Sequence, residues 1–327
     1  MSIRAVGIDI SKAKLDVALY QDETYQEATF ANNRDGFRRL AKWLKKHKAK
    51  QAHVCIEATG RYGEEVAEYL QGRGYPVSLV NPARIKAYGD SQLKRNKNDP
   101  QDARLIAHFC ATQKPTLWTP PPPEVKELRA LTRHLESLKS DRARELNRKQ
   151  SGLSSEAVLQ SIDEHIAFLD TQIEQLEQQI NDLIDQDPTL RQQQELLTSI
   201  PGIGNTTAAS FIAEVPDVLR FESAGQLAAH AGLTPRQHHS GSSVHRRSRL
   251  AKKGSSRLRT LFFFPALAAI NWNPIVKALA HRLEERGKSR MTIVGAAMRK
   301  LLHLAYGVLK NGKPFDANYL VNVHGTV

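Results

Sequence analysis

The sequence predicts an α/β domain, a long helical middle and a mainly helical C-terminal domain, and three observations lead to this prediction. Residues 3–112 alternate short β-rich runs with amphipathic helical runs. Residues 159–183 carry a heptad repeat. The remainder has helical periodicity interrupted by Gly and Pro, and the 327 residues suffice for two cores and a connecting element. We expect domains at 1–115, 116–189 and 190–327.

In the first domain, two β-rich runs follow each other within a few residues. These are VGIDI and LDVALY, and so short a connection implies an antiparallel hairpin. The later runs AHVCIEA and PVSLVNP are separated by the helical run GEEVAEYLQGRG, as in strand-helix-strand units. A mixed sheet of antiparallel and parallel strands is therefore expected.

The middle region begins with a stiff connector and contains a heptad repeat. WTPPPPE, starting at Trp118, interrupts any helix because consecutive prolines fix the backbone and remove donors. Residues 125–150 are basic, whereas 151–187 contain nine Asp or Glu and no Lys or Arg. Eight apolar residues in the acidic part recur at steps of three and four: Leu159, Ile162, Ile166, Leu169, Ile173, Leu176, Ile180 and Leu183. This favours a coiled-coil seam that forms a homodimer, with packing on the helix's own domain as the alternative.

The charge balance of the chain points to a polyanionic partner. There are 47 Lys and Arg against 34 Asp and Glu, a formal net charge of +13, which favours nucleic acid. The longest apolar run, around 261–270, is too short to span a bilayer, so no membrane partner is expected. The first residues lack a secretory signal pattern, which predicts a cytoplasmic protein. Cys55 and Cys110 lie in no CxxC or Cys/His motif, so neither a disulfide framework nor a zinc site is predicted.

Four acidic residues stand where apolar elements end or begin. Asp9 lies in the apolar run VGIDIS, and Glu57 ends the apolar run of HVCIEATG. An unpaired buried carboxylate costs several kcal/mol, so such residues need a cation or hydrogen-bond donors. Asp99 and Asp102 lie in NKNDPQDARLIAHF, where Pro100 fits the first turn of a helix and Asp99 its N-cap. Their three-residue spacing places both acids on one face of that helix.

A converging set of carboxylates without matching bases predicts a site for hard divalent cations. Mg²⁺ prefers oxygen ligands and keeps waters for a phosphate substrate. Two such ions can stabilise the attacking and leaving oxygens of phosphoryl transfer, the chemistry of nucleases and strand-transfer enzymes. The spacing is only moderately specific, and helix capping alone accounts for Asp99 but not for Asp102.

The run LLTSIPGIGNTTAASFIAEV is typical of a helix-hairpin-helix, with Pro201 and the two glycines shaping the turn. Backbone N–H groups in such a turn, together with a helix N-terminus, can hold a DNA phosphate without reading bases. The alternative is a turn that only joins two packed helices. The candidate contacts are Gly202, Gly204, Asn205 and Thr206.

A basic segment with a serine-containing loop follows. Residues 236–259 contain eight Lys or Arg, three His and no acidic residue, a density better explained by phosphate contact than by a solvated charge run. The candidate contacts are Arg236, Arg246, Arg247, Arg249, Lys252 and Lys253. HHSGSS places Ser240, Ser242 and Ser243 among these cations, where a serine can attack phosphorus once its proton is removed. Composition does not distinguish one of the three hydroxyls.

Taken together, these motifs resemble a known family. GIDIS with Asp9, CIEATG with Glu57, NDPQDAR with Asp99 and Asp102, then SIPGIG, LAAHAGLTPR and SGSS occur in the order found in the DEDD insertion-sequence transposases of bacteria, the IS-one-ten class. Active members of this class are RNA-guided bridge recombinases. The resemblance covers nearly the whole chain.

The resemblance implies several properties that the residues alone do not. It implies an RNase H-like (RuvC-like) first domain whose four acids hold Mg²⁺, a coiled-coil middle, and a C-terminal transposase domain whose serine links covalently to cut DNA. By motif that serine is Ser240, the first in HHSGSS. It further implies a tetramer, made of two dimers, in which Ser240 of one protomer meets the acids of another. A noncoding guide RNA would pair with double-stranded donor and target DNA, and the protein would act at the bacterial nucleoid.

The sequence thus predicts a Mg²⁺-dependent recombinase-transposase that cuts DNA with Ser240, exchanges strands and rejoins them. The first alternative is a RuvC-like junction endonuclease that uses metal-activated water, with Ser240 incidental. The second is a non-catalytic helix-hairpin-helix scaffold for nucleic acid, in which the acids only cap helices or form ion pairs.

Overall fold

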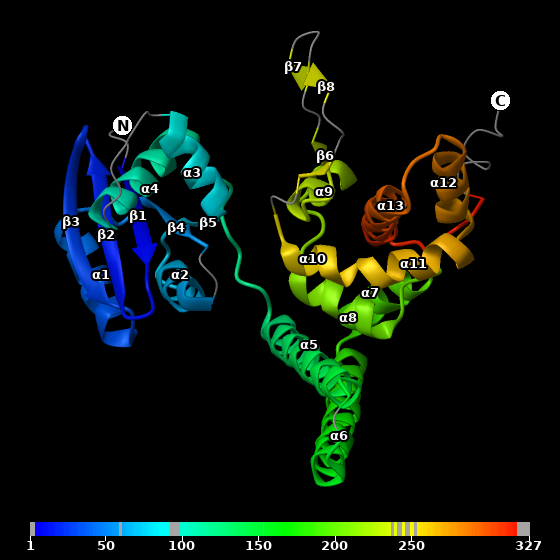
Figure 1. Ribbon diagram of the computed structural model, residues 1–327. Helices are drawn as coiled ribbons and strands as arrows, with labels where there is room; N and C mark the ends of the chain where they lie inside the picture. Colours follow the sequence, from blue (N-terminus) through cyan, green and yellow to red (C-terminus); the bar gives the residue numbers. More distant parts are fainter. Residues whose placement is uncertain are drawn as a thin grey trace. The chain divides into compact units, whose positions relative to one another are not determined.

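The structure is a computed structural model that describes residues 4–58, 61–91, 99–152, 154–236, 239–240, 244–245, 249–251 and 254–318. The chain divides into two compact units, Met1–Pro120 and Pro121–Val327. Figure 1 shows the sheet and its helices in the first unit and the helical second unit. The helices of the predicted middle region belong to the same compact unit as the C-terminal helices.

The first unit is built on a five-stranded sheet of order β3-β2-β1-β4-β5. Three antiparallel strands come first in the chain, and two later strands extend the sheet parallel to β1. Their bounds are β1 Arg4–Ile10, β2 Lys14–Gln21, β3 Thr24–Ala31, β4 His53–Glu57 and β5 Val77–Val80. The prediction of a mixed sheet is confirmed.

Helices cover both faces of this sheet (Figure 1). Alternation along β1 sends Val6, Ile8 and Ile10 to the face where they form one core with apolar residues of α1 and α2. Ala5 and Gly7 lie on the opposite face, toward α4. The helices are α1 Arg34–Lys46, the 3₁₀ turn η1 Arg61–Gly63, α2 Glu64–Gln71, α3 Pro82–Ser91 and α4 Asp99–Gln113.

Helix α4 lies unusually close to β1 because residue 7 is glycine. A Cβ at Gly7 would stand 2.2 Å from the carbonyl oxygen of Ala103 and 2.3 Å from the amide nitrogen of Ala107. No side chain fits between the two backbones, so helix and strand are in direct contact. A salt bridge also joins α4 to β3, because the Arg104 guanidinium donates to both carboxylate oxygens of Glu27 at 2.5 and 2.7 Å. These contacts fix the position of α4 over the sheet.

The second unit begins with a hairpin of two long helices, α5 Pro123–Lys149 and α6 Glu156–Gln186. Salt bridges join basic residues of α5 to acidic residues of α6: Lys139 to Glu177 at 2.6 Å, Lys149 to Asp163 at 2.5 Å, and Arg142 to Asp170. The basic and the acidic stretch of the sequence therefore form the two helices of one hairpin, which are joined by ion pairs between opposite charges.

The predicted heptad seam is buried within this single chain. Six of its residues, from Ile162 to Ile180, are between 3% and 9% exposed, and α6 packs on α5. The repeat thus corresponds to the alternative in which the helix packs on its own unit. The heptad repeat is therefore not evidence for a second chain. A homodimer through this seam stays a prediction that the repeat no longer supports.

The remaining helices of the second unit share one core with that hairpin. Its central member is α13, whose Leu301, Leu302 and Ala305 are fully buried. The helices are α7 Pro188–Thr198, α8 Asn205–Glu214, α9 Ala224–His230, α10 Ser256–Leu261, α11 Phe263–Trp272, α12 Pro274–Glu285 and α13 Arg290–Asn311. Two small hairpins pair β6 Pro235–Arg236 with β9 Arg249–Leu250, and β7 His239–Ser240 with β8 Val244–His245. Among the described residues, no helix has the length and apolar character needed to cross a membrane.

Candidate active site

Asp9 and Glu57 lie beside each other at one edge of the sheet. The parallel pairing of β1 with β4 aligns Gly7 with Cys55 and Ile8 with Ile56, so the next residues in register are Asp9 and Glu57. Alternation places Asp9 on the same face as Gly7, and Glu57 on the same face as Cys55, which is the face covered by α4. Both acids are partly exposed.

Helix α4 brings its first turn to the same edge. Its later part lies at the start of the strands, where the Cys110 thiol donates to the carbonyl of His53 at 3.3 Å. About two helical turns before Cys110, Ala103 lies against Gly7 in the middle of β1. The helix therefore runs opposite to β1, and its N-terminal residues come next to the strand end that carries Asp9.

Asp102 and Asp99 occupy this first turn of α4. The side chain of Asp102 is partly buried, and Asp99 is the first residue of the helix. For Asp99 only the backbone position is described. The backbone thus brings three carboxylates and the position of a fourth to one edge of the sheet, and a shared metal site at this edge stays a prediction.

A fifth carboxylate, Asp16, stands next to this group and was missed by the sequence analysis. The antiparallel register pairs Asp16 of β2 with Asp9 of β1, so both side chains lie on the same face. Asp16 is only 7% exposed, accepts a hydrogen bond from the Thr29 hydroxyl at 2.8 Å, and pairs with Lys14 at 2.8 Å. An acid within the apolar run of LDVALY was the available signal.

Behind the acids, His53, Cys55 and Cys110 form a second polar cluster between β4 and α4. Their ligand-type atoms all lie within 4.8 Å of one another. Burial lowers the pKa of His53, while a hydrogen bond to Cys55, together with burial, raises the pKa of the Cys110 thiol. At neutral pH the imidazole and the Cys110 thiol are therefore uncharged.

In the second unit, the turn between α7 and α8 has both a packing part and an exposed part. Gly202 has a φ of +105°, and a Cβ there would be 2.8 Å from the Ala269 Cβ and 3.0 Å from the Pro265 carbonyl oxygen. Gly202 therefore seats the turn against α11. By contrast, Gly204, Asn205 and Thr206 are exposed at the start of α8. The structure has two helices and a connecting turn here, and phosphate binding by this turn stays a prediction.

The predicted serine and all six predicted cations lie either in the small paired strands or outside the described part of the chain. Ser240 is in β7, where it pairs with Val244. For Ser240, Arg236 and Arg249 the backbone alone is described. The other four predicted phosphate contacts lie outside the described residues: Arg246, Arg247, Lys252 and Lys253.

Two further cations of the basic segment hold the second unit together. Arg257 pairs with Glu136 of α5 at 2.6 Å. Arg259 donates to the carbonyls of Ala231 and Gly254 at 3.1 and 3.2 Å. Of the eight basic residues in the segment, these two therefore have partners within the protein.

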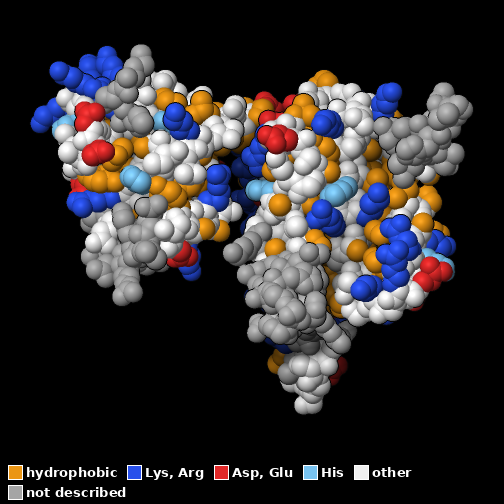
Figure 2. Space-filling model, turned by 90° about the horizontal axis from the view of Figure 1, so that it is seen from above, with side chains coloured by type: hydrophobic (Ala, Val, Ile, Leu, Met, Phe, Trp, Pro, Cys, Tyr) orange, Lys and Arg blue, Asp and Glu red, His pale blue; other side chains and the backbone are white. Residues whose placement is uncertain are grey.

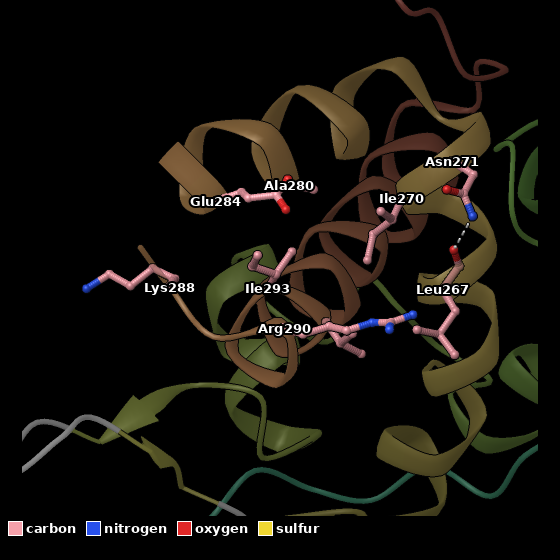
Figure 3. A pocket seen from close by; sticks show the side chains of 9 residues that line it. Leu267, Ile270, Asn271, Ala280, Glu284, Lys288, Arg290 and Ile293 are labelled. Atoms are coloured by element: carbon pink, nitrogen blue, oxygen red, sulfur yellow. Dashed lines mark hydrogen bonds between the residues drawn. The ribbon is translucent and has the colours of Figure 1, made fainter. Parts of the chain in front are cut away.

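A pocket of about 450 Å³ opens between α11, α12 and α13. Figure 3 shows apolar side chains such as Ile270 and Ile293 around it, the Arg290 side chain reaching toward Leu267, and Lys288 and Glu284 at its rim. The residues lining it include none of those predicted from the sequence. Over the face of the molecule shown in Figure 2, Lys and Arg side chains are widely spread, with few Asp and Glu among them.

Two models of known protein families match parts of this chain. A family model described as "Transposase" matches residues 6–158, which contain the sheet, the four acids and α5. A second, described as "Transposase IS116/IS110/IS902 family", matches residues 194–281, from α7 to α12. The class to which these two matches assign the chain is that of the transposases.

Individual relatives specify the family. The "Pilin gene-inverting protein" of Moraxella bovis is 37% identical over 97% of this chain and 98% of its own length. The "Transposase for insertion sequence element IS1111A" of Coxiella burnetii is 28% identical over 66% of this chain and 65% of its own length. The chain belongs to the IS110/IS116 family of transposases, and the resemblance stated from its motifs is confirmed.

Proposed function

We propose that this chain is a Mg²⁺-dependent DNA recombinase that cuts, exchanges and rejoins the strands of an insertion sequence. In this proposal Asp9, Glu57, Asp99 and Asp102 hold two Mg²⁺ ions, and Ser240 is the nucleophile. The observation that carries the proposal is the convergence of acids from β1, β4 and α4 at one edge of the sheet.

The residues at this edge fit such a metal site. Carboxylate oxygens are the ligands that Mg²⁺ prefers, and the direct contact of Gly7 with α4 brings the first turn of the helix to the strand ends. Asp16 is held by Lys14 and Thr29, so its charge is balanced within the sheet. When bound, Mg²⁺ would polarise the scissile phosphate and stabilise charge on the attacking and leaving oxygens.

Ser240 would supply the covalent step. Its Oγ forms a bond to phosphorus while the bond from phosphorus to the leaving sugar oxygen breaks, and the hydroxyl proton is transferred to a base or to water. In the reverse reaction, a sugar hydroxyl of another strand attacks the phosphoserine and releases Ser240. The number of phosphodiester bonds is unchanged, so rejoining needs no external energy source.

Partners follow from the same proposal. The exposed start of α8 at Gly204, Asn205 and Thr206 can hold phosphates through backbone N–H groups, and the basic segment 236–253 supplies cations. A noncoding guide RNA supplies sequence choice, and the active complex is a tetramer in which Ser240 of one protomer serves the acids of another.

The test is to trap the covalent intermediate on DNA that carries the element's ends and a nick that lets the leaving strand diffuse away. The full chain should form an adduct in Mg²⁺ that releases phosphoserine on hydrolysis. Ser240→Ala should abolish the adduct, whereas Ser242→Ala, a matched control two residues later in the sequence, should retain it. Asp102→Asn should lower cleavage by at least about 10²-fold while DNA binding persists.

Two results would favour the rival functions. Cleavage at the normal rate by Ser240→Ala would indicate metal-activated water, as in a junction endonuclease. Full function of Asp102→Asn without any requirement for Mg²⁺ would indicate a nucleic-acid scaffold.

A further inference from the structure

We propose that His53, Cys55 and Cys110 form a binding site for one thiophilic metal ion, Zn²⁺, which joins β4 to α4 behind the carboxylates. The three residues come from sequence positions too far apart to form a spacing motif, and the fold brings them together. Their donor atoms lie within 4.8 Å of one another. In a tetrahedral zinc site, adjacent ligand atoms are about 3.5–3.8 Å apart, so small side-chain movements suffice.

The hydrogen bonds of His53 give its imidazole the form that a metal ligand needs. Its Nε2 lies 2.7 Å from the Ser78 hydroxyl. That hydroxyl has one proton, directed to the carbonyl of Pro115 or Thr116 at 3.1 or 2.8 Å. Ser78 must therefore accept from the Nε2–H of His53, which leaves the lone pair on Nδ1. Metal-binding histidines are oriented in this way, through a hydrogen bond from the nitrogen that does not bind the ion.

Charge and access also suit a divalent ion. Cys55 is 0% and Cys110 1% exposed, so an uncompensated charge between them would be costly. Zn²⁺ with two thiolates and a neutral imidazole has no net charge, and the two thiol protons pass to solvent as the ion binds. His53 is partly exposed, which gives an entry path.

The position of the cluster assigns the ion a structural role. Cys55 lies two residues before Glu57 on β4, and Cys110 lies on the helix that begins with Asp99 and carries Asp102. An ion bound by both thiolates would link the strand and the helix that supply the carboxylates. It would position those residues without contacting DNA.

The test uses Co²⁺ as a spectroscopic probe on the full chain, reduced and free of Mg²⁺ and DNA. The sequence contains only two cysteines, both in this cluster, so a thiolate-to-cobalt charge-transfer band can arise only here. We expect one Co²⁺ per chain, displaced by one equivalent of Zn²⁺, and slower amide exchange in α4 when Zn²⁺ is bound.

Substitutions test which of these residues bind the ion. Cys110→Ala should abolish the band, and His53→Gln and Ser78→Ala should weaken Zn²⁺ binding by about tenfold or more. His47→Gln is the matched control in the same unit, because its ring contacts the Trp43 ring at a tilt and lies outside the cluster; this variant should bind Zn²⁺ normally. If Cys110→Ala does not fold, Zn²⁺ titrations of His53→Gln and Ser78→Ala test the proposed site, since both variants keep the two thiols.

The site is overturned if no thiolate-to-cobalt band forms, or if His53→Gln and Ser78→Ala bind Zn²⁺ as tightly as the unmodified chain. Asp102→Asn should leave the band unchanged. Failure of this inference is therefore distinct from failure of the proposed Mg²⁺ chemistry.

Discussion

At the scale of single residues, the geometry of the acidic edge depends on a glycine. Gly7 carries no charge and forms no side-chain contact, yet its missing Cβ lets the backbone of α4 lie directly on β1. The distance between Asp102 on the helix and Asp9 on the strand is set by that contact. The absence of a side chain at Gly7 thus determines the separation of Asp9 and Asp102.

Gly7→Ala should therefore impair both stability and cleavage. The new Cβ would lie 2.2 Å from the Ala103 carbonyl oxygen, so α4 must move away from the sheet at a cost of about 3 kcal/mol or more. We expect a melting temperature lower by about 10 °C or more for the first unit, and cleavage reduced with the acids intact. Thermal melts and cleavage assays check this.

Gly307→Ala in α13 is the control for that substitution. A Cβ there meets no heavy atom within 4 Å, and alanine is the better helix former, so stability should be unchanged or higher. Equal stability of Gly7→Ala and the unmodified chain would contradict the close contact between α4 and β1.

At the scale of elements, the α5–α6 hairpin shows how a heptad repeat can be satisfied within one chain. Basic residues of α5 face acidic residues of α6, and the apolar seam lies between the two helices. The heptad pattern specifies a partner helix but not whether that helix belongs to the same chain.

Ile173→Asp should destabilise the second unit through this hairpin. Ile173 is 8% exposed, and a carboxylate there would be buried without a partner, at a cost of about 3 kcal/mol or more. Phe168→Asp, on the same helix but 59% exposed, should change the stability by no more than about 0.5 kcal/mol. Circular dichroism melts measure both.

A comparable loss of stability in Phe168→Asp would show that the outer face of α6 is covered by another chain. Light scattering on the same samples would then reveal a change in mass. The expected outcome is that only Ile173→Asp lowers the melting temperature.

At the scale of the whole molecule, the net charge is +13, and residues 236–259 contribute eight Lys or Arg to it without any acidic residue. Some cations are already paired within the protein, as Arg257 is with Glu136. The six remaining cations of the basic segment, from Arg236 to Lys253, are the predicted phosphate contacts. Their effect on binding should depend on salt, because cations that contact DNA phosphates displace counterions.

DNA binding should weaken by about 10³-fold or more between 50 and 200 mM salt, if six or more phosphates are contacted. Arg246→Gln combined with Arg247→Gln should reduce the slope of log K against log salt by about 0.9 per lost contact. Arg38→Gln is the control, because that guanidinium pairs with Asp35 at 2.9 Å. Fluorescence anisotropy with a labelled duplex measures the slopes.

An unchanged slope in the double variant would assign the phosphate contacts to other cations. An equal decrease in Arg38→Gln would indicate a general effect of net charge rather than contact by the basic segment.

Much of the fold and of the acidic edge could be predicted from the sequence. The apolar, β-rich runs of VGIDIS and HVCIEATG indicated strands that carry Asp9 and Glu57, and NDPQDAR indicated a helix starting near Asp99. These are local signals, since capping, proline and alternation act within a few residues. The order of the motifs along the chain was sufficient to indicate the family.

Only the tertiary structure decided which surfaces meet. It paired Asp16 with Asp9, brought His53 and Cys55 to Cys110, placed α5 on the seam of α6, and seated Gly202 against α11. A hydrophobic period shows that a face is buried but does not identify what covers it, because sheet register and helix packing join residues distant in sequence. The sequence by itself therefore determined the acids near the ends of the elements, and the packing of α4 on β1 decided that they lie at one edge of the sheet.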